Sequence, residues 1–266
     1  MRSYKEKALR ALTIALLTLP LALAACDKAA TPPVAEETMS ALDAPPAIPV
    51  MGPERPILAF GDSLLAGYGL NDGESYPDRL EQALRARGIN ARVINAGVSG
   101  DTTEAGLERL DFTLSSQKEK PELVIISLGG NDMLRGLPPA TTRNNLEAIL
   151  QRLKQENIKV VLLGMLAAPN LGKDYAAKFN PIYAQLSEKY DAALVPFFLQ
   201  PVIDKPDLMQ PDHMHPTALG VDAIVTATVD DVADALPTGA EAEASEAASD
   251  VAVPPTASAG EERMAR

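Results

Sequence analysis

Residues 56–70, P-I-L-A-F-G-D-S-L-L-A-G-Y-G-L, combine a short apolar run, a polar turn and a segment that can form a helix. The apolar residues 57–60 are typical of a short buried strand, and Gly61 ends this run at a residue that tolerates unusual backbone angles. Ser63 stands just past the carboxyl end of the strand, where open α/β sheets bind their ligands. We therefore treat Ser63 as a candidate nucleophile, while Asp62 and Ser63 could also simply cap a helix.

The rest of the chain alternates between amphipathic and apolar segments. Hydrophobic periodicity and capping residues predict helices at 76–87, from Thr102 or Thr103 to before 118, at 141–156, at 175–190 and at 217–236. Short apolar runs predict further strands at 91–95, 122–128, 159–163 and 193–195. Strands that alternate with helices of this length indicate a three-layer α/β/α domain with a five-stranded, mostly parallel sheet.

The two ends of the chain differ from this central part. Residues 1–25 have basic residues followed by an apolar stretch, which is typical of an export signal, and the only cysteine, Cys26, comes directly after it. Leu-Ala-Ala-Cys resembles the lipobox of bacterial lipoproteins, in which the cysteine is lipidated; the alternative is an ordinary signal peptide with an incidental cysteine. Residues 26–55 and 237–266 are rich in Pro, Ala, Glu and Thr and predict a disordered tether and a disordered acidic tail.

These features predict an exported protein, held by a lipid on Cys26 at the periplasmic face of a bacterial membrane, either inner or outer. The functional domain is then residues 56–236, a length that suits one domain with a sizeable core. The formal net charge of the whole chain is −12, and no cluster of lysines and arginines interrupts it, which argues against a nucleic-acid partner. We expect a monomer.

Polar turns follow three of the predicted strands. They are Gly61-Asp62-Ser63, Ser99-Gly100-Asp101 and Gly129-Gly130-Asn131-Asp132. The carboxyl ends of parallel strands meet at one edge of the sheet, so we expect these turns to lie together. They then supply a hydroxyl, a closely approaching backbone N–H and a carboxamide donor, which are the groups needed to attack a carbonyl and to hold the resulting oxyanion.

The base that a serine nucleophile requires is predicted in Q-P-D-H-M-H-P-T, residues 210–217. This segment contains both histidines of the chain, His213 and His215. Asp212 precedes His215 by three residues, a spacing that lets the carboxylate bond one ring nitrogen while the other faces the serine. His213 is the alternative base, but we favour His215 because Pro216 after it fixes its position at a helix start.

The motifs G-D-S-L (61–64), S-G-D-T (99–102), G-G-N-D (129–132) and D-x-x-H-P (212–216) occur in this order. Together they resemble the four sequence blocks of the SGNH (GDSL) hydrolase family, especially its thioesterase I/lysophospholipase/arylesterase branch, over residues 56–236. The sequence departs from the family at His213, where relatives often have a small residue. The resemblance implies a flavodoxin-like α/β/α fold and hydrolysis of carboxylic esters or thioesters through an acyl-enzyme.

The resemblance also implies roles for five residues. Ser63 is the expected nucleophile, His215 the base, and Asp212 the residue that orients the base. The expected oxyanion hole consists of the Ser63 and Gly100 backbone N–H groups and the Asn131 side chain. We expect no cofactor and no metal.

The substrate pocket is expected among apolar residues that follow the third and fourth strands, although most of these could equally be core. They are Met133, Leu134, Leu137, Leu166 and Leu171. Because no strong basic cluster accompanies them, we expect short-chain or aryl esters, lysophospholipids or acyl thioesters rather than strongly anionic substrates.

Three other readings are weaker. An α/β-hydrolase would carry G-x-S-x-G, whereas Leu65 stands at the fifth position here. A metallophosphoesterase would need more imidazoles than two histidines supply. A catalytically inactive lipoprotein that only binds lipid or sugar would have no need to keep all five residues of the expected site.

Overall fold

Five strands form a parallel sheet at the centre of the computed structural model, which describes residues 50–238. The strand order is β2-β1-β3-β4-β5, the order of flavodoxin-like folds, so the predicted fold class is confirmed. The strands are β1 (Arg55–Gly61), β2 (Ala91–Gly97), β3 (Leu123–Ser127), β4 (Lys159–Leu163) and β5 (Ala193–Val195).

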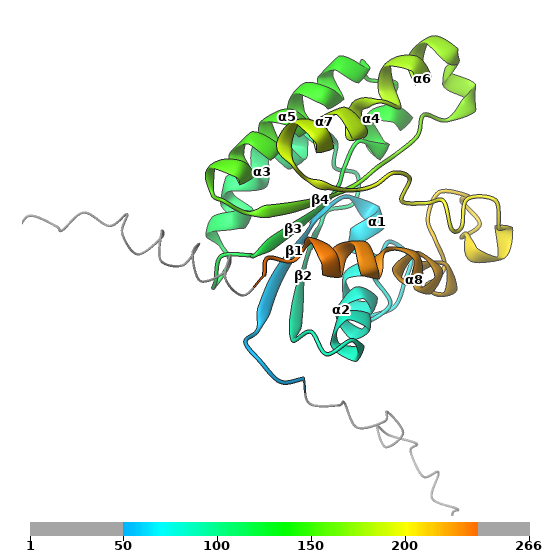
Figure 1. Ribbon diagram of the computed structural model, residues 1–266. Helices are drawn as coiled ribbons and strands as arrows, with labels where there is room; N and C mark the ends of the chain where they lie inside the picture. The colour runs from blue at the N-terminus through cyan, green and yellow to red at the C-terminus, as the bar shows by residue number, and fades with distance from the viewer. Residues whose placement is uncertain (1–49, 239–266) are drawn as a thin grey trace, which may run out of the picture. The chain divides into compact units, whose positions relative to one another are not determined.

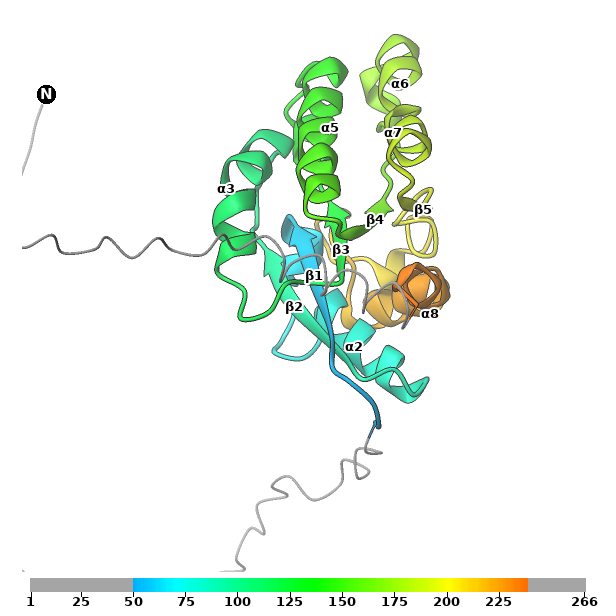
Figure 2. The ribbon, with the colours of Figure 1, turned by 60° about the vertical axis from the view of Figure 1, so that its left-hand side comes forward.

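Helices cover both faces of the sheet, as Figures 1 and 2 show. On one face lie α3 (Thr103–Ser115), α5 (Pro139–Gln155), α6 (Lys173–Phe179) and α7 (Ile182–Tyr190). On the other face lie α2 (Tyr76–Ala86) and α8 (Ala218–Ala235). All five residues of β3 are buried, as expected of a strand with helices on both faces.

Polar side chains fix where α2, α3 and α8 begin, whereas α5 begins after Pro138 with no side-chain cap. The side chain of Ser75 accepts a hydrogen bond from the Asp78 N–H at the start of α2, and Thr217 accepts one from the Gly220 N–H at the start of α8. Of the two candidate caps for α3, Thr102 is the one observed. The helix considered after Ser63 is present as the short α1 (Ser63–Ala66), which Asp62 caps. Three further short elements were not expected: α4 (Gly130–Leu134) and the 3₁₀ turns η1 (Pro169–Leu171) and η2 (Pro206–Leu208).

The single helix expected at 175–190 was wrong. The segment forms two helices, α6 and α7, which are separated at Asn180 and Pro181. Proline lacks the N–H that the helical ladder needs, so the helix breaks there. The break leaves the Asn180 side chain free to accept a 2.8 Å hydrogen bond from the Ala167 N–H in the loop after β4.

The carboxyl ends of the three neighbouring strands are in register. Gly61 at the end of β1 is paired with Gly97 of β2 and with Ser127 of β3. The loops that follow these strands therefore start side by side at one edge of the sheet. This edge is where the sequence predicts the functional residues.

The opposite edge of the sheet holds both ends of the described chain. The Arg55 guanidinium at the start of β1 pairs with Glu122 and donates a 2.7 Å hydrogen bond to the Pro237 carbonyl. The predicted signal 1–25, the predicted lipidation site Cys26, most of the predicted tether and most of the predicted tail lie outside the described residues. Within residues 50–238, no helix is both long and apolar enough to cross a membrane.

Candidate active site

Ser63 is the first residue of α1, directly after the carboxyl end of β1. The preceding Asp62 caps this helix, because its side chain accepts a hydrogen bond from the Leu64 N–H. The turn requires glycine at position 61, where an added Cβ would lie 2.5 Å from the Ser127 carbonyl oxygen. The tight junction between strand and helix therefore holds the Ser63 side chain at the edge of the sheet.

Asp212 and His215 form a compact turn before α8. One carboxylate oxygen of Asp212 accepts the backbone N–H groups of Met214 and His215, at 2.9 and 3.1 Å. The other oxygen lies 2.6 Å from His215 Nδ1. Partial burial acts to raise the pKa of Asp212, but the hydrogen bonds from His215 and from the two backbone N–H groups lower it to about 2. The carboxylate is therefore ionised at neutral pH.

The second ring nitrogen of His215 faces Ser63. His215 Nε2 lies 2.9 Å from Ser63 Oγ, although the two residues are 152 positions apart in the chain. His213, the alternative base, has a φ of 56° and lines the same cavity as Ser63 and His215, but no hydrogen bond within residues 50–238 joins its ring to Ser63. The Tyr68 ring packs against the His215 ring with 4.6 Å between centroids, a contact that the sequence did not suggest.

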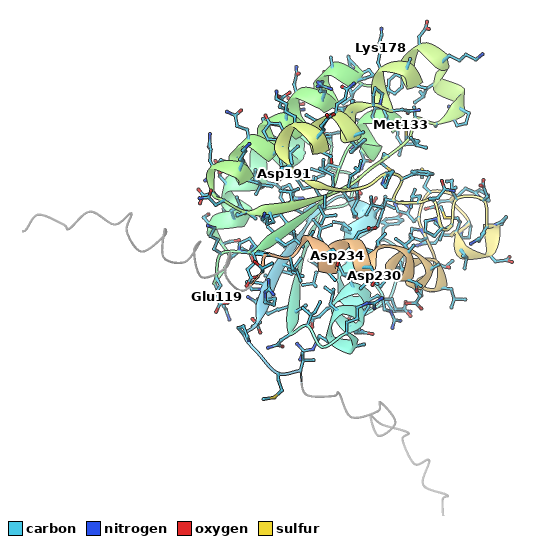
Figure 3. All side chains as sticks on the ribbon, viewed as in Figure 1. Glu119, Met133, Lys178, Asp191, Asp230 and Asp234 are labelled. Carbon is cyan, nitrogen blue, oxygen red and sulfur yellow. The ribbon has the colours of Figure 1, made fainter. Side chains whose placement is uncertain are left out.

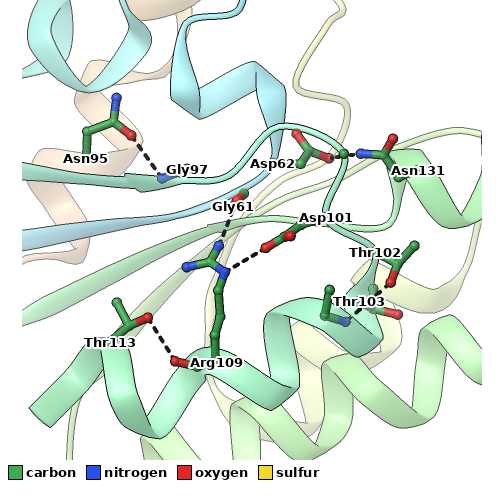
Figure 4. Close-up of polar contacts among 12 residues, drawn as sticks. Gly61, Asp62, Asn95, Gly97, Asp101, Thr102, Thr103, Arg109, Thr113 and Asn131 are labelled. Atoms are coloured by element: carbon green, nitrogen blue, oxygen red, sulfur yellow. Dashed lines mark hydrogen bonds and ion pairs between the residues drawn. The ribbon is translucent and has the colours of Figure 1, made fainter.

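The two other expected donors line the same cavity as Ser63. Gly100 lies in the loop after β2 and Asn131 lies in α4, directly after β3. Within residues 50–238, the backbone N–H groups of Ser63 and Gly100 have no protein acceptor. One N–H of the Asn131 carboxamide donates to Asp62 Oδ2 at 3.4 Å, which leaves the other N–H available to a ligand (Figure 4).

A buried carboxylate that sequence reasoning missed holds α4 in place. Asp132 is fully buried and accepts hydrogen bonds from the Thr103 N–H and hydroxyl and from the Thr142 hydroxyl. Asn145 in turn donates to the Thr103 hydroxyl. These bonds join α4 to the starts of α3 and α5. Asn131, which precedes Asp132, therefore lies on a helix whose position is fixed by α3 and α5.

Asp62 is itself a buried acid next to the serine. Its side chain is 2 % exposed, and burial raises its pKa from 3.8 to about 6, against the opposing effects of the Leu64 N–H, His215 and Asn131. The sequence suggested only a helix cap here. The structure shows in addition a direct contact between this carboxyl group and the Asn131 side chain.

A cavity of about 560 Å³ opens beside Ser63. Three of the expected pocket residues line it, namely Met133 on α4 (labelled in Figure 3), Leu134 and Leu166. Leu137 and Leu171 do not line it. Leu137 follows the end of α4, where its N–H bonds the Asp132 carbonyl, and Leu171 ends the 3₁₀ turn η1.

Most of the remaining lining is apolar and comes from positions that the sequence did not assign to the pocket, some of them within the motifs around Ser63 and His215. It includes Leu64, Tyr68, Met165, Phe197, Leu199, Ile203 and Met214. Phe197 belongs to the V-P-F-F segment, but the other positions carry no sequence signal that separates a pocket residue from a core residue. No lysine or arginine of residues 50–238 lines the cavity. Nor does any group of three or more His, Cys, Asp or Glu in this range have the geometry to hold a metal ion.

Known proteins resemble this chain over the same region. The GDSL-like Lipase/Acylhydrolase family matches residues 59–223. Esterase TesA of Pseudomonas aeruginosa PAO1 is 42% identical over 160 residues, which are 60% of this chain and 79% of TesA. Thioesterase 1/protease 1/lysophospholipase L1 of Escherichia coli K12 is 38% identical over 160 residues, 60% of this chain and 74% of that protein.

A solved structure extends the likeness to three dimensions. The crystal structure of AlinE4, an SGNH-hydrolase family esterase, is 63% identical, with a TM-score of 0.60, and covers 71% of this chain and 100% of AlinE4. The family match, these relatives and the arrangement of the three loops agree. The chain therefore belongs to the GDSL-like lipase/acylhydrolase family of SGNH hydrolases and is a serine ester hydrolase.

Proposed function

We propose that Ser63, His215 and Asp212 catalyse the hydrolysis of carboxylic esters or thioesters that carry an apolar acyl or aryl group, through an acyl-enzyme. The observation that supports this most directly is the line of hydrogen bonds from Asp212 through the two ring nitrogens of His215 to Ser63, at 2.6 and 2.9 Å. A serine hydroxyl needs an adjacent base to become a nucleophile, and the base needs a group that fixes its orientation.

In the first half of the reaction, His215 Nε2 takes the proton of the Ser63 hydroxyl as the oxygen attacks the carbonyl carbon. The ionised Asp212 keeps Nδ1 protonated and stabilises the imidazolium that forms. His215 then gives its proton to the departing alcohol or thiol, which leaves an acyl group on Ser63. A water molecule, deprotonated by the same imidazole, releases the acid and regenerates the serine.

The negative charge of the tetrahedral intermediate falls on the former carbonyl oxygen. The unpartnered N–H groups of Ser63 and Gly100 and the free N–H of Asn131 line the cavity and can donate to this oxygen. Such donors stabilise the transition state more than the ground state, because the charge develops only as the bond forms. Loss of one donor typically lowers kcat by about 10² to 10³-fold.

The cavity supports a neutral, apolar substrate. Its volume of about 560 Å³ lies within the usual range of small-molecule sites, and its lining is mostly aliphatic and aromatic. Five of its lining residues are large apolar side chains that remain exposed: Tyr68, Leu134, Leu166, Ile203 and Met214. The relatives' names, esterase and thioesterase 1/lysophospholipase L1, support esters, thioesters and lysophospholipids as candidates.

Covalent labelling tests the catalytic assignment. An aryl phosphonate should add one phosphonyl group to the protein, located on Ser63 by peptide mass spectrometry, and should abolish p-nitrophenyl ester hydrolysis. Ser63→Ala should take up no label and show no acyl-enzyme, while a matched substitution of a distant serine, Ser187→Ala on α7, should behave as the parent. Labelling at another residue, or full activity of Ser63→Ala, would contradict the proposal.

A panel of p-nitrophenyl esters of increasing chain length tests the substrate class. If the apolar cavity takes the acyl group, kcat/KM should rise by up to about fourfold for each added CH₂, because burying one is worth about 0.8 kcal/mol, and then level off when the cavity is full. A lysophospholipid and an acyl-CoA run beside the panel show whether a bulky or charged leaving group is accepted. A rate that is highest for acetate and falls with every added carbon would exclude the cavity as an acyl site.

A further inference from the structure

Arg135 contacts the two segments that carry Gly100 and Asn131, the expected oxyanion donors other than Ser63. It is the residue that ends α4, and its backbone N–H donates to the Asn131 carbonyl at 3.0 Å. Its side chain reaches the loop after β2, where Nη2 donates to the Gly100 carbonyl at 2.7 Å. One residue thus links the helix of Asn131 to the peptide of Gly100.

Gly100 lies in a turn that is closed by a 3.1 Å hydrogen bond from the Asp101 N–H to the Val98 carbonyl. It has a φ of +89°, a conformation that favours glycine, and an added Cβ would meet only Arg135 Nη2, at 3.8 Å. No other hydrogen bond within residues 50–238 engages the Gly100 N–H or carbonyl. The Gly100 carbonyl and the Asp101 N–H belong to one peptide group, so the bond from Arg135 holds this group at its carbonyl end while the bond to Val98 holds it at its N–H end. The Gly100 N–H lies on the preceding peptide group, and its direction follows from this fixed group through the backbone angles of Gly100.

The next residue of this loop, Asp101, is held by a different arginine, Arg109. Arg109 on α3 pairs with Asp101 at 2.6 Å and donates to the Gly61 carbonyl at 2.9 Å, as Figure 4 shows. Its guanidinium also lies over the Phe60 ring at 4.0 Å. Arg109 therefore joins the loops after β1 and β2, whereas Arg135 joins those after β2 and β3. Arg109 is packed among structural contacts, while Arg135 is exposed and can be replaced with little effect on packing.

The bond from Arg135 is also of a strong kind. Within residues 50–238 its guanidinium has no carboxylate partner and makes one side-chain hydrogen bond, to the Gly100 carbonyl. A hydrogen bond from a charged donor is shorter and stronger than a neutral one. We propose that Arg135 is a positioning residue of the oxyanion hole, which holds the Gly100 N–H in line with the Asn131 carboxamide. This inference rests on the oxyanion hole of the proposed function.

The first test compares Arg135→Ala with the parent in hydrolysis of a p-nitrophenyl ester. The Gly100 donor is misplaced rather than removed, so kcat should fall about 10-fold, less than the 10² to 10³-fold loss of a deleted donor. KM should stay within about twofold, because the donor acts on the developing charge and not on the bound ester. Arg143→Ala on α5 is the matched control, since Arg143 also makes a side-chain hydrogen bond to a neutral acceptor, Gln185, and should leave kcat unchanged.

Two further readouts separate positioning from a general loss of structure. Added guanidinium at millimolar concentration should restore part of the kcat of Arg135→Ala and leave the parent and Arg143→Ala unaffected. The preference for an oxygen ester over the corresponding thionoester should shrink in Arg135→Ala, because sulfur is a poor hydrogen-bond acceptor and gains little from an intact oxyanion hole.

An Arg135→Ala variant with parental kcat, or with a lower kcat but an unchanged preference for the oxygen ester and no response to guanidinium, would overturn the inference. Failure of the proposed function is a separate outcome. The proposed function fails if Ser63→Ala still hydrolyses the ester. Failure of the inference alone leaves the parent active and Ser63→Ala inactive.

Discussion

At the scale of single residues, the burial of the Asp62 carboxyl group lowers the stability of the folded protein at neutral pH, and its hydrogen-bond partners do not offset this effect. Its carboxyl group is 2 % exposed, and burial raises its pKa from 3.8 to about 6. Since the folded-state pKa lies above the unfolded value, the folded protein holds this proton more tightly. The contribution of Asp62 to the free energy of unfolding is therefore largest below about pH 4 and is lost as the pH rises through about 6.

Asp62→Asn should make the protein more stable at pH 8 by about 3 kcal/mol, because the amide still caps α1 but cannot ionise. At pH 4, where Asp62 is largely protonated in the folded state, the variant and the parent should differ little. Urea unfolding at the two pH values measures both differences. A gain of equal size at pH 4 and pH 8 would show that the ionisation of Asp62 is not its cause.

The residues of the site differ in how far the sequence predicts them. Ser63, Asp212 and His215 stand in motifs whose spacing already suggests a shared site, and the structure brings these three side chains together. Arg109 and Arg135 stand in no such pattern, because their partners are carbonyls and side chains on other loops, and those contacts exist only after the chain has folded. The sequence also failed to place Leu137, because an apolar side chain can line a cavity or lie outside it, and Leu137 lies outside.

At the scale of elements, α7 supports the turn that carries Asn131. The Tyr183 hydroxyl on α7 donates a buried 2.8 Å hydrogen bond to the Leu128 carbonyl at the end of β3. The next residue, Gly129, has a φ of +107°, and an added Cβ would lie 2.3 Å from the same hydroxyl. Glycine is thus required at this position by both the backbone angle and the close approach of α7.

Tyr183→Phe should lower the free energy of unfolding by about 1 to 3 kcal/mol, because the buried Leu128 carbonyl loses its donor and cannot reach water. Tyr190→Phe, at the end of the same helix, is the control; its hydroxyl bonds the side chain of Glu147 near the surface and its loss should cost less than about 1 kcal/mol. Chemical denaturation of the two variants gives the comparison. Equal losses for both would mean that the Tyr183 hydroxyl does not support the turn.

Hydrophobic periodicity predicts the strands and long helices better than it predicts helix breaks and short helices. All five strands and the long helices α2, α5 and α8 lie within about two residues of their expected bounds, because burial on one or both faces leaves a regular pattern. The helix expected at 175–190 failed at Pro181, where one local steric effect outweighs the pattern on both sides. The four-residue α1 is too short to have a period at all.

At the scale of the whole described region, the candidate site and the two ends of the described chain lie at opposite edges of the sheet. Ser63, Gly100 and Asn131 follow the carboxyl ends of the strands, whereas Arg55 at the start of β1 is bonded to the Pro237 carbonyl near the end of the described chain. β1 has seven residues, so the two edges are separated by about 20 Å at 3.3 Å per residue. Chain segments that continue from either end therefore begin far from the site.

This arrangement predicts that residues 50–238 alone carry the full activity on soluble esters. A protein cut to these residues should have the same kcat and KM for a short p-nitrophenyl ester as the full chain, since every residue proposed for the site and the core that positions it lies within the range. Arg55 should be kept, because its bond to Pro237 joins the two ends, and Arg55→Ala should lower stability without changing kcat. Steady-state kinetics of the two forms, with circular dichroism to verify folding, makes the comparison. A well-folded truncated protein with a much lower kcat would mean that the segments beyond residues 50–238 take part in the reaction.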